Sequence, residues 1–229
     1  MSSAPVAFAG EPGAFAEDAA LAAFGEVART GVGGFREVFE AVREGRARAG
    51  VVPIENLVNG TVRENYDLLL EHDLVIAGEV IVPVRLCLAA LPGQRIEDIE
   101  RVYSHIQALG QAEAFLRRRP WTLLTTYNTA GAGKLIADRE EPRAAAVLSP
   151  RAAALFGLDV LAGDIQDVAD NRSRFIIVTR PPSPAITGPG PRRTTLVFGV
   201  RNEPGSLLRA LAVFAEREVN LSRLESRPS

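Results

Sequence analysis

The sequence predicts an α/β fold, because short apolar runs alternate with amphipathic stretches through most of the 229 residues. The composition is that of a globular chain, with 47% hydrophobic and 24% charged residues. The formal net charge of −2 gives no general basic field, which argues against binding of a nucleic-acid backbone. We therefore expect an α/β domain with a mainly parallel sheet.

The elements follow in order. An apolar run at 6–9 predicts a strand, and the turn Gly10-Glu11-Pro12-Gly13 leads into a helix that buries Phe15, Ala19, Ala22 and Ala23. Period-2 or fully apolar runs predict further strands at 49–54, 102–104, 122–126, 145–148 and 174–179, and two within 74–91. Helical spacing predicts helices at 35–43, 61–71, 106–118, 129–139 and 150–156.

Residues 181–191 differ in composition, since they hold five of the fifteen prolines of the chain. Proline cannot donate to a helix or sheet ladder, so this segment predicts a semi-rigid linker. Beyond it we expect a strand at 195–200, a helix at 204–217 with Leu207, Leu211 and Phe214 buried, and a strand at 220–225. Such a unit is small for an independent core.

Several other classes of protein are disfavoured. Cys87 is the single cysteine, and the two histidines, His72 and His105, form no pattern with metal-ligand spacing. The longest apolar stretch, 74–91, is interrupted by Glu79, Pro83 and Arg85, and no targeting signal is evident. We expect a cytoplasmic protein without a metal or cofactor.

Polar residues at predicted helix starts suggest where a ligand binds. Thr61, Ser104, Asn128 or Thr129, and Ser149 each have the form of an N-cap. In open parallel sheets ligands bind at the carboxyl ends of strands, where helix N-termini favour an anion. Each cap also has the simpler interpretation that it only starts a helix.

Other polar residues lack an obvious structural role. Asn56 follows an apolar strand, Gln111 lies two helical turns after Ser104, and Ser173-Arg174-Phe175 opens another strand. In a regular strand Ser173 and Arg174 point to opposite faces.

Ordered motifs along nearly the whole chain together resemble the prephenate dehydratase family. They are Gly10-Glu11-Pro12-Gly13, Pro53-Ile54-Glu55-Asn56, Ser104-His105-Ile106-Gln107, Asn171-Arg172-Ser173-Arg174-Phe175 and, after the linker, Glu203-Pro204-Gly205-Ser206-Leu207 and Glu225-Ser226-Arg227-Pro228. The resemblance implies a two-lobed catalytic domain at 4–180, like periplasmic ligand-binding proteins, with crossover strands near 77–84 and 163–170. It also implies a linker at 181–193 and a partial ferredoxin-like ACT regulatory domain at 194–229.

The activity implied is that of a lyase, the conversion of prephenate to phenylpyruvate, CO2 and water in phenylalanine synthesis. The resemblance gives Ser173 the essential hydroxyl and makes Asn56, Ser104, Gln111, Thr129 and Arg174 substrate contacts. For Arg174 a buried salt bridge to segment 166–170 is the alternative, and His105 is expected to pack or cap. Ser173, Leu57 and Ile106 depart from the usual family residues Thr, a hydroxyl residue and Pro.

Two other functions remain open, an arogenate dehydratase that uses Glu55 to bind an ammonium group and a non-catalytic amino-acid sensor. A homodimer or homotetramer is expected. The allosteric inhibitor implied is L-phenylalanine, bound by Pro204, Gly205, Ser206, Leu207, Glu225, Ser226, Arg227 and Pro228. Because only the first half of a βαββαβ fold is present, we expect that half to need cover from its own catalytic domain, a second subunit or a longer chain, and feedback inhibition to be weak or lost.

Overall fold

The computed structural model describes residues 4–182 and 192–225, in two compact units, 1–188 and 189–229. Most of the expected linker, 183–191, and three of the expected phenylalanine-binding residues, Ser226, Arg227 and Pro228, lie outside the described residues. The two units are described separately.

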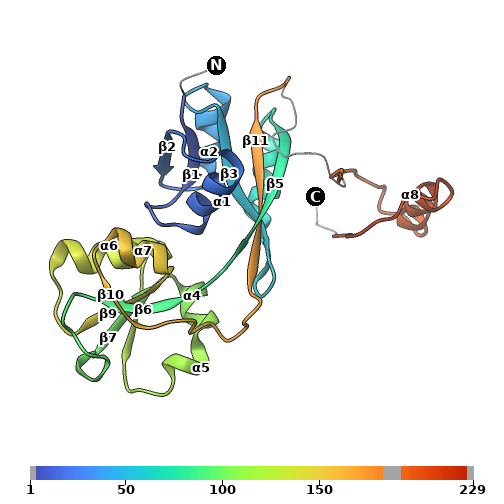
Figure 1. Cartoon of the computed structure of the whole chain (residues 1–229). Helices are drawn as coiled ribbons and strands as arrows, with labels where there is room; N and C mark the ends of the chain where they lie inside the picture. Colours follow the sequence, from blue (N-terminus) through green and yellow to red (C-terminus); the bar gives the residue numbers. More distant parts are fainter. Residues whose placement is uncertain (1–3, 183–191, 226–229) are drawn as a thin grey trace. The chain divides into compact units, whose positions relative to one another are not determined.

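The first lobe of the larger unit is built on one sheet with the strand order β2-β1-β3-β11-β5, and β4 pairs with β3 (Figure 1). Helix α2 contacts this sheet at β1 and β3 and α3 contacts it at β3, whereas α1 packs against β1, β3 and β5. Its elements are β1 (Val6–Ala9), α1 (Phe15–Phe24), β2 (Arg29–Val32), α2 (Phe35–Arg43), β3 (Ala49–Asn56), β4 (Gly60–Thr61), α3 (Arg63–Glu71), β5 (Val75–Pro83) and β11 (Arg172–Thr179).

The second lobe has its own five-stranded sheet, in the order β10-β6-β9-β7-β8. Its elements are β6 (Cys87–Ala90), η1 (Ile96–Asp98), β7 (Arg101–Ser104), α4 (Ile106–Gln111), α5 (Glu113–Leu116), β8 (Thr122–Thr125), α6 (Thr129–Arg139), β9 (Ala144–Leu148), α7 (Pro150–Leu155) and β10 (Asp159–Ala162). The two-lobed α/β architecture expected from the family resemblance is confirmed.

Period-2 alternation divides the core of each lobe between the two faces of its sheet. In β3, Val51 packs on the α1 side, while Val52 and Ile54 join the α2 and α3 side. In β6, Cys87 packs on the α6 and α7 side, while Leu88 packs on the α4 and α5 side. Both sheets are thus covered on both faces, which explains why their strands are almost continuously apolar.

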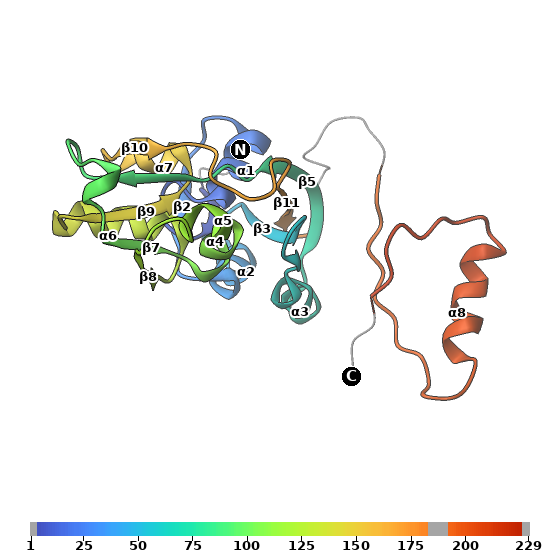
Figure 2. The ribbon, with the colours of Figure 1, turned by 90° about the horizontal axis from the view of Figure 1, so that it is seen from below.

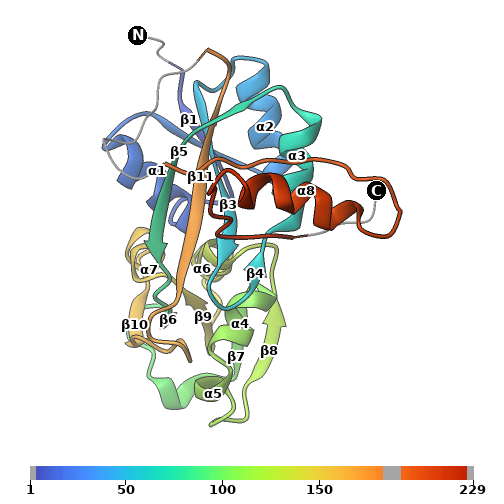
Figure 3. The ribbon, with the colours of Figure 1, turned by 90° about the vertical axis from the view of Figure 1, so that its right-hand side faces the viewer.

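The chain crosses between the lobes twice, after β5 and before β11 (Figures 1 and 3). The two connections are held together where the Val84 N–H donates to the Asn171 carbonyl at 2.8 Å and the Ile165 N–H donates to the Leu86 carbonyl at 2.9 Å. The first crossing is a strand as expected, but the strand predicted near 163–170 is wrong, because none of these residues belongs to a strand. A chain that leaves and returns must reverse direction, so β11 runs antiparallel to both β3 and β5.

The prediction of a mainly parallel sheet is therefore wrong, since each sheet mixes parallel and antiparallel pairs. Strand β2 was not predicted, because its sequence Arg-Thr-Gly-Val has little apolar character. Ala22 is exposed rather than buried.

Two of the predicted caps are confirmed and two are wrong. The Asn128 Oδ1 accepts from the Gly131 N–H, and the Ser149 Oγ accepts from the Ala152 N–H at 3.0 Å. Helix α3 instead starts after Val62, without a side-chain cap, and α4 is capped by His105. A helix start depends on the path of the preceding strand, which a local sequence pattern does not specify.

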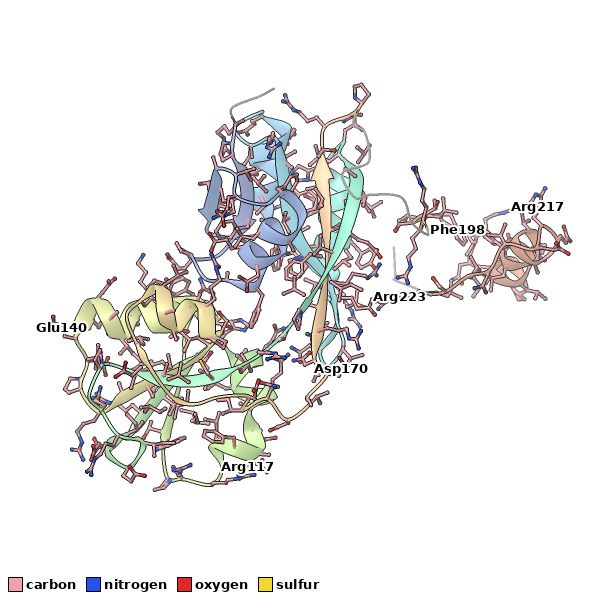
Figure 4. All side chains as sticks on the ribbon, viewed as in Figure 1. Arg117, Glu140, Asp170, Phe198, Arg217 and Arg223 are labelled. Atoms are coloured by element: carbon pink, nitrogen blue, oxygen red, sulfur yellow. The ribbon has the colours of Figure 1, made fainter. Side chains whose placement is uncertain are left out.

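The smaller unit has one of its three predicted elements, the helix α8 (Ser206–Ala215). The segments 195–200 and 220–225 are not strands, which corrects the prediction. In a split β-α-β arrangement the two strands do not pair with each other but with a strand between them, and the described residues provide none. Leu207 is correspondingly exposed, and Phe214 packs only partly, with its ring 6.2 Å from that of Phe198. Phe198 is labelled in Figure 4.

Among the residues that the structure describes, no helix combines the length and the apolar character that a bilayer crossing requires.

The lobes meet tightly at Gly13, which yields a stability prediction. Gly13 has a φ of +87°, and a Cβ there would lie 2.7 Å from the Ala152 Cβ of the other lobe. Gly93 has a similar φ of +82° but no atom within 4 Å of such a Cβ. Gly93→Ala should lose about 1–2 kcal/mol through backbone strain alone, and Gly13→Ala a further ~1–3 kcal/mol through overpacking.

Urea unfolding of both variants measures the difference. Equal losses would mean that the lobes separate easily enough to relieve the contact.

Candidate functional site

The central contact of the candidate site joins the end of β3 to the start of β11. Asn56 and Ser173 are directly paired across these strands, and the Asn56 Nδ2 donates to the Ser173 Oγ at 2.9 Å. Ser173 is only 9% exposed. The amide and the hydroxyl therefore form a fixed pair, although 117 residues separate them in the sequence.

The orientation of the Asn56 amide is set by the backbone of the next turn. Its Oδ1 accepts from the N–H groups of Val58 at 3.0 Å and Asn59 at 2.9 Å. Because backbone N–H groups can only donate, the Nδ2 end must face Ser173. The Ser173 oxygen is thus an acceptor in this pair, and its own proton is left for another acceptor.

Gln111 adds a contribution from the second lobe. It ends α4, which lies beside the β3–β4 turn (Figures 2 and 3), and its Nε2 donates to the Asn56 Oδ1 at 3.3 Å. Its backbone carbonyl accepts from the Asp167 N–H at 2.7 Å, which ties α4 to the returning connection. The structure thus brings Asn56, Gln111 and Ser173 together at the junction of the lobes.

Ser104 and Thr129 are placed differently. The Ser104 hydroxyl is fully buried and donates to the Val147 carbonyl at 2.6 Å, so it ties β7 to β9. Thr129 is the first residue of α6, and none of the hydrogen bonds among the described residues joins it to Asn56 or Ser173. The substrate contacts expected of these two residues stay predictions.

Arg174 lies on the opposite face of β11 from Ser173, as strand alternation predicts. Its guanidinium binds two carboxylates, Glu55 of β3 and Glu79 of β5, each at 3.1 Å. Arg174 therefore forms salt bridges, as the alternative predicted, but its partners do not come from segment 166–170. In that segment Asp170, labelled in Figure 4, pairs with Arg172 at the start of β11. The role of Arg174 as a substrate clamp stays a prediction.

A second set of contacts closes the lobes together at the rim formed by the Gly10–Asp18 segment and helices α6 and α7. Glu11 accepts from the Tyr127 hydroxyl at 3.0 Å and from Lys134, the only lysine of the chain, at 3.1 Å. A cavity of about 180 Å³ lies beside this contact, lined by Gly10, Glu11, Gly31, Val32, Gly33, Tyr127 and Asn128.

Arg151 of α7 forms the other rim contact. Its Nη1 lies 2.8 Å from the Glu17 Oε2 and 3.0 Å from the Asp18 Oδ1. Burial raises the pKa of Glu17, but hydrogen bonds from Arg151, the Gly13 N–H and Arg29 outweigh it, so the net pKa is lowered. For Asp18, burial raises the pKa and Arg151 offsets only part of the change.

The thiol and the imidazoles of the chain are poorly suited to catalysis. Burial, with the charge of Asp164, raises the pKa of the Cys87 thiol to about 11, so the nucleophilic thiolate is scarce at neutral pH. Burial lowers the pKa of His105, whose Nδ1 accepts from the Gln107 N–H, which confirms the expected capping role. His72 is buried against Phe39.

A larger hollow of about 900 Å³ lies at the amino ends of β7 and β8, lined in part by Arg101, Arg119 and Trp121. This edge of the sheet is opposite to the one that carries Ser104. The hollow is wide, and Asn56, Gln111 and Ser173 are not among the residues that line it.

Sequence reasoning missed three residues. Asn171 accepts from the Asn56 Nδ2 at 2.9 Å, and Glu11 and Arg151 bridge the lobes. Glu11 and Asn171 belong to two of the motifs that carry the family resemblance. No local sequence pattern, however, distinguishes a side chain that contacts a distant segment from one that is exposed to solvent. The solitary Lys134 in an arginine-rich chain was the one available signal.

The residues expected to bind phenylalanine lie in the smaller unit. Pro204, Gly205, Ser206 and Leu207 surround the start of α8, where Arg209 donates to the Ser206 hydroxyl at 3.0 Å. Glu225 lies 3.4 Å from the Arg223 guanidinium.

Fold and site together define a two-lobed α/β protein with neutral hydrogen-bond donors at the junction of its lobes. The family model of prephenate dehydratase matches residues 6–183. The chain therefore belongs to the prephenate dehydratase family.

Individual relatives extend this result. Arogenate dehydratase/prephenate dehydratase 2, chloroplastic, of Arabidopsis thaliana is 44% identical over 97% of this chain and 58% of its own length. Two solved structures each have a TM-score of 0.83 and cover 98% of this chain. They are prephenate dehydratase from Arthrobacter aurescens in complex with L-Phe (35% identity, 76% of that chain) and the quorum-quenching acylase GqqA (31%, 81%). The chain spans a little over half the length of the curated relatives it matches.

The rim contact makes a prediction that depends on pH. Arg151→Met leaves the buried Glu17 carboxylate without its principal cation, so we expect a loss of about 1.5–3 kcal/mol at pH 7. Without Arg151 the pKa values of Glu17 and Asp18 both rise in the folded state. In the parent chain the lowered pKa of Glu17 contributes its full stability above the unfolded pKa and loses it as the pH falls through the folded pKa. The advantage of the parent chain should therefore shrink as the pH falls below about 4.

Denaturant unfolding at pH 7 and pH 3.5 measures this effect. Arg36→Met is the control, because Arg36 pairs with Glu71 on the surface of one lobe and both side chains are about half exposed. If Arg151→Met lowers the free energy of unfolding no more than Arg36→Met does, or lowers it more at pH 3.5 than at pH 7, Arg151 does not stabilise the Glu17 carboxylate as assigned.

Proposed function

We propose that this chain catalyses the decarboxylating dehydration of prephenate to phenylpyruvate, CO2 and water. The observation that carries the proposal is the Asn56–Ser173 pair, in which the serine oxygen accepts and its proton remains available. Gln111 adds a further neutral donor from the other lobe. A cluster rich in donors suits a dianionic substrate with a hydroxyl that must leave.

The reaction needs little more than such a cluster. As the ring carboxylate departs as CO2, its electron pair enters the ring and expels the hydroxyl, which takes up one proton and leaves as water. Formation of the aromatic ring supplies the driving force, so no base is required at carbon. Ser173 donates a hydrogen bond or proton to the departing oxygen, and Asn56 keeps the hydroxyl in the donating orientation.

Arogenate is the second candidate substrate, because curated relatives are named arogenate dehydratases. Arogenate carries an ammonium group in place of the keto group. The carboxylate considered for that ammonium, Glu55, pairs with Arg174 on the face opposite to Ser173. This pairing favours prephenate, and assays of both substrates with one enzyme preparation separate the two.

An acylase activity, suggested by the name of one structural relative, is less well supported. Acyl transfer by a serine requires a general base within hydrogen-bond reach. Among the described residues the hydrogen-bond partner of Ser173 is the Asn56 amide, which donates. A non-catalytic sensor would bind prephenate without turnover, and the same assay tests it.

The domain roles, location and assembly are also proposals. Residues 4–180 form the catalytic part, 181–193 the linker and 194–229 the regulatory part. A homodimer or homotetramer is proposed from the family resemblance, and a cytoplasmic location from the sequence, whereas several plant relatives are named chloroplastic.

Substitution of Ser173 tests the mechanism. Ser173→Ala should lower kcat about 10²–10⁴-fold with little change in KM, because the lost interaction acts on the departing group. Ser173→Thr should retain activity, since it keeps the hydroxyl and restricts χ1. The rate of phenylpyruvate formation from prephenate, followed by ultraviolet absorbance, measures both.

An alanine variant within threefold of the parent chain would remove Ser173 from the mechanism. If the parent chain turns over neither prephenate nor arogenate, the proposed activity itself is wrong.

Phenylalanine regulation can be tested on the same chain. A relative was solved in complex with L-Phe, but here 195–200 and 220–225 form no sheet around α8. We therefore expect phenylalanine to inhibit this 229-residue chain weakly. Activity measured against increasing phenylalanine tests this, and full inhibition at micromolar concentration would contradict it.

A further inference from the structure

Asn171 is a buried polar residue that directly precedes β11 and contacts the candidate site. Its side chain is only 2% exposed, and its Oδ1 accepts from the Asn56 Nδ2 at 2.9 Å. The same Nδ2 donates to the Ser173 Oγ at 2.9 Å. A third acceptor, the Arg172 carbonyl, lies farther from this Nδ2, at 3.2 Å. The two shorter contacts of one amide group thus connect Asn171 and Ser173 through Asn56.

The backbone of Asn171 is fixed by both connections between the lobes. Its N–H donates to the Val168 carbonyl at 3.2 Å within the returning connection, and its carbonyl accepts from the Val84 N–H at 2.8 Å in the outgoing one. The acceptor offered to Asn56 is therefore anchored where the lobes join.

The orientation of the Asn171 amide follows from that of Asn56. Since the Asn56 Oδ1 faces the Val58 and Asn59 N–H groups, Asn171 must present its oxygen to the Asn56 Nδ2. The Asn171 Nδ2 is then left buried without a hydrogen-bond partner in the described structure. A buried donor without a partner destabilises the folded state. The hydrogen bond from Asn56 to the Asn171 Oδ1 offsets part of this cost.

We propose that Asn171 is a positioning residue, which accepts one Nδ2 proton of Asn56 and, together with the Val58 and Asn59 N–H groups at the Oδ1 end, holds the amide so that its other N–H points at the Ser173 oxygen. By fixing that acceptor role, Asn171 directs the Ser173 proton toward the substrate. The inference rests on the proposed dehydratase function and adds a residue to it.

A double-mutant cycle distinguishes positioning from simple structural support. Asn171→Ala should lower kcat about 10–100-fold and leave KM within threefold. In an Asn56→Ala background the same substitution should cost less than threefold, because the residue it acts through is absent. If Asn171→Ala lowers kcat by the same factor in the parent chain and in the Asn56→Ala background, the proposal is wrong.

Asn65 provides a matched control. It is fully buried in the same lobe, donates to the Pro53 carbonyl at 2.6 Å, and also has one side-chain atom without a partner, its Oδ1. Asn65→Ala should lower the denaturation midpoint as Asn171→Ala does, yet keep kcat within threefold of the parent chain. A comparable kcat loss in both variants would assign the effect to stability.

Asn171→Asp tests the same contact if the alanine variant does not fold. Aspartate keeps the acceptor for Asn56, so its kcat should stay within tenfold of the parent chain at the best pH. The new carboxyl should add a titration step to the pH profile of kcat. Complete loss of activity at every pH, with the fold intact, would contradict the assignment.

A readout independent of turnover separates this proposal from the dehydratase function. The side-chain amide signals of Asn56 in ¹⁵N NMR spectra, assigned by their loss in Asn56→Ala, should shift in Asn171→Ala and not in Asn65→Ala. If the chain turns over neither substrate but these signals shift, the function fails and the contact stands. Unchanged signals would refute the positioning role.

Discussion

Insertion of strand β11 between β3 and β5 is the constraint on which the rest of the larger unit depends. The chain leaves the first lobe along β5, builds the whole second lobe, and returns to complete the first sheet. This return places Ser173 opposite Asn56 and sets the connection beside Val84. The candidate site and the first core therefore both depend on β11, and a chain without this strand would lack both.

Strand alternation in the same region separates neutral from charged chemistry. Asn56 and Ser173 lie on one face of the sheet, whereas Glu55, Arg174 and Glu79 form an ion-paired group on the other. A buried charged group would need a counter-charge from the protein in the absence of a ligand, whereas the neutral donors near the junction do not. This arrangement is consistent with the proposed reaction, which requires neither a nucleophile nor a base from a chain with two histidines and one buried cysteine.

The lobes are joined on two sides by different interactions. On one side the connections carry backbone hydrogen bonds and the amide cluster of Asn56, Gln111 and Asn171. At the rim, Arg151 with Glu17 and Lys134 with Glu11 supply ion pairs, and Gly13 packs closely on Ala152. Backbone bonds fix the geometry of the junction, whereas ion pairs between partly exposed side chains respond to pH and salt.

The sequence alone determined the α/β class, most of the helices and strands, a cap at Asn128 or Thr129, the cap at Ser149, and the opposite orientation of Ser173 and Arg174, because all of these follow from spacing within a few residues. It did not predict the antiparallel return of β11, the contact of the Ser104 hydroxyl with Val147, or the absence of strands at 195–200 and 220–225. Each of these features depends on whether a pairing strand or a hydrogen-bond acceptor far away in the sequence is present. Only the tertiary structure decides such features, since a hydrogen bond between distant residues forms only after the backbone has brought its donor and acceptor together.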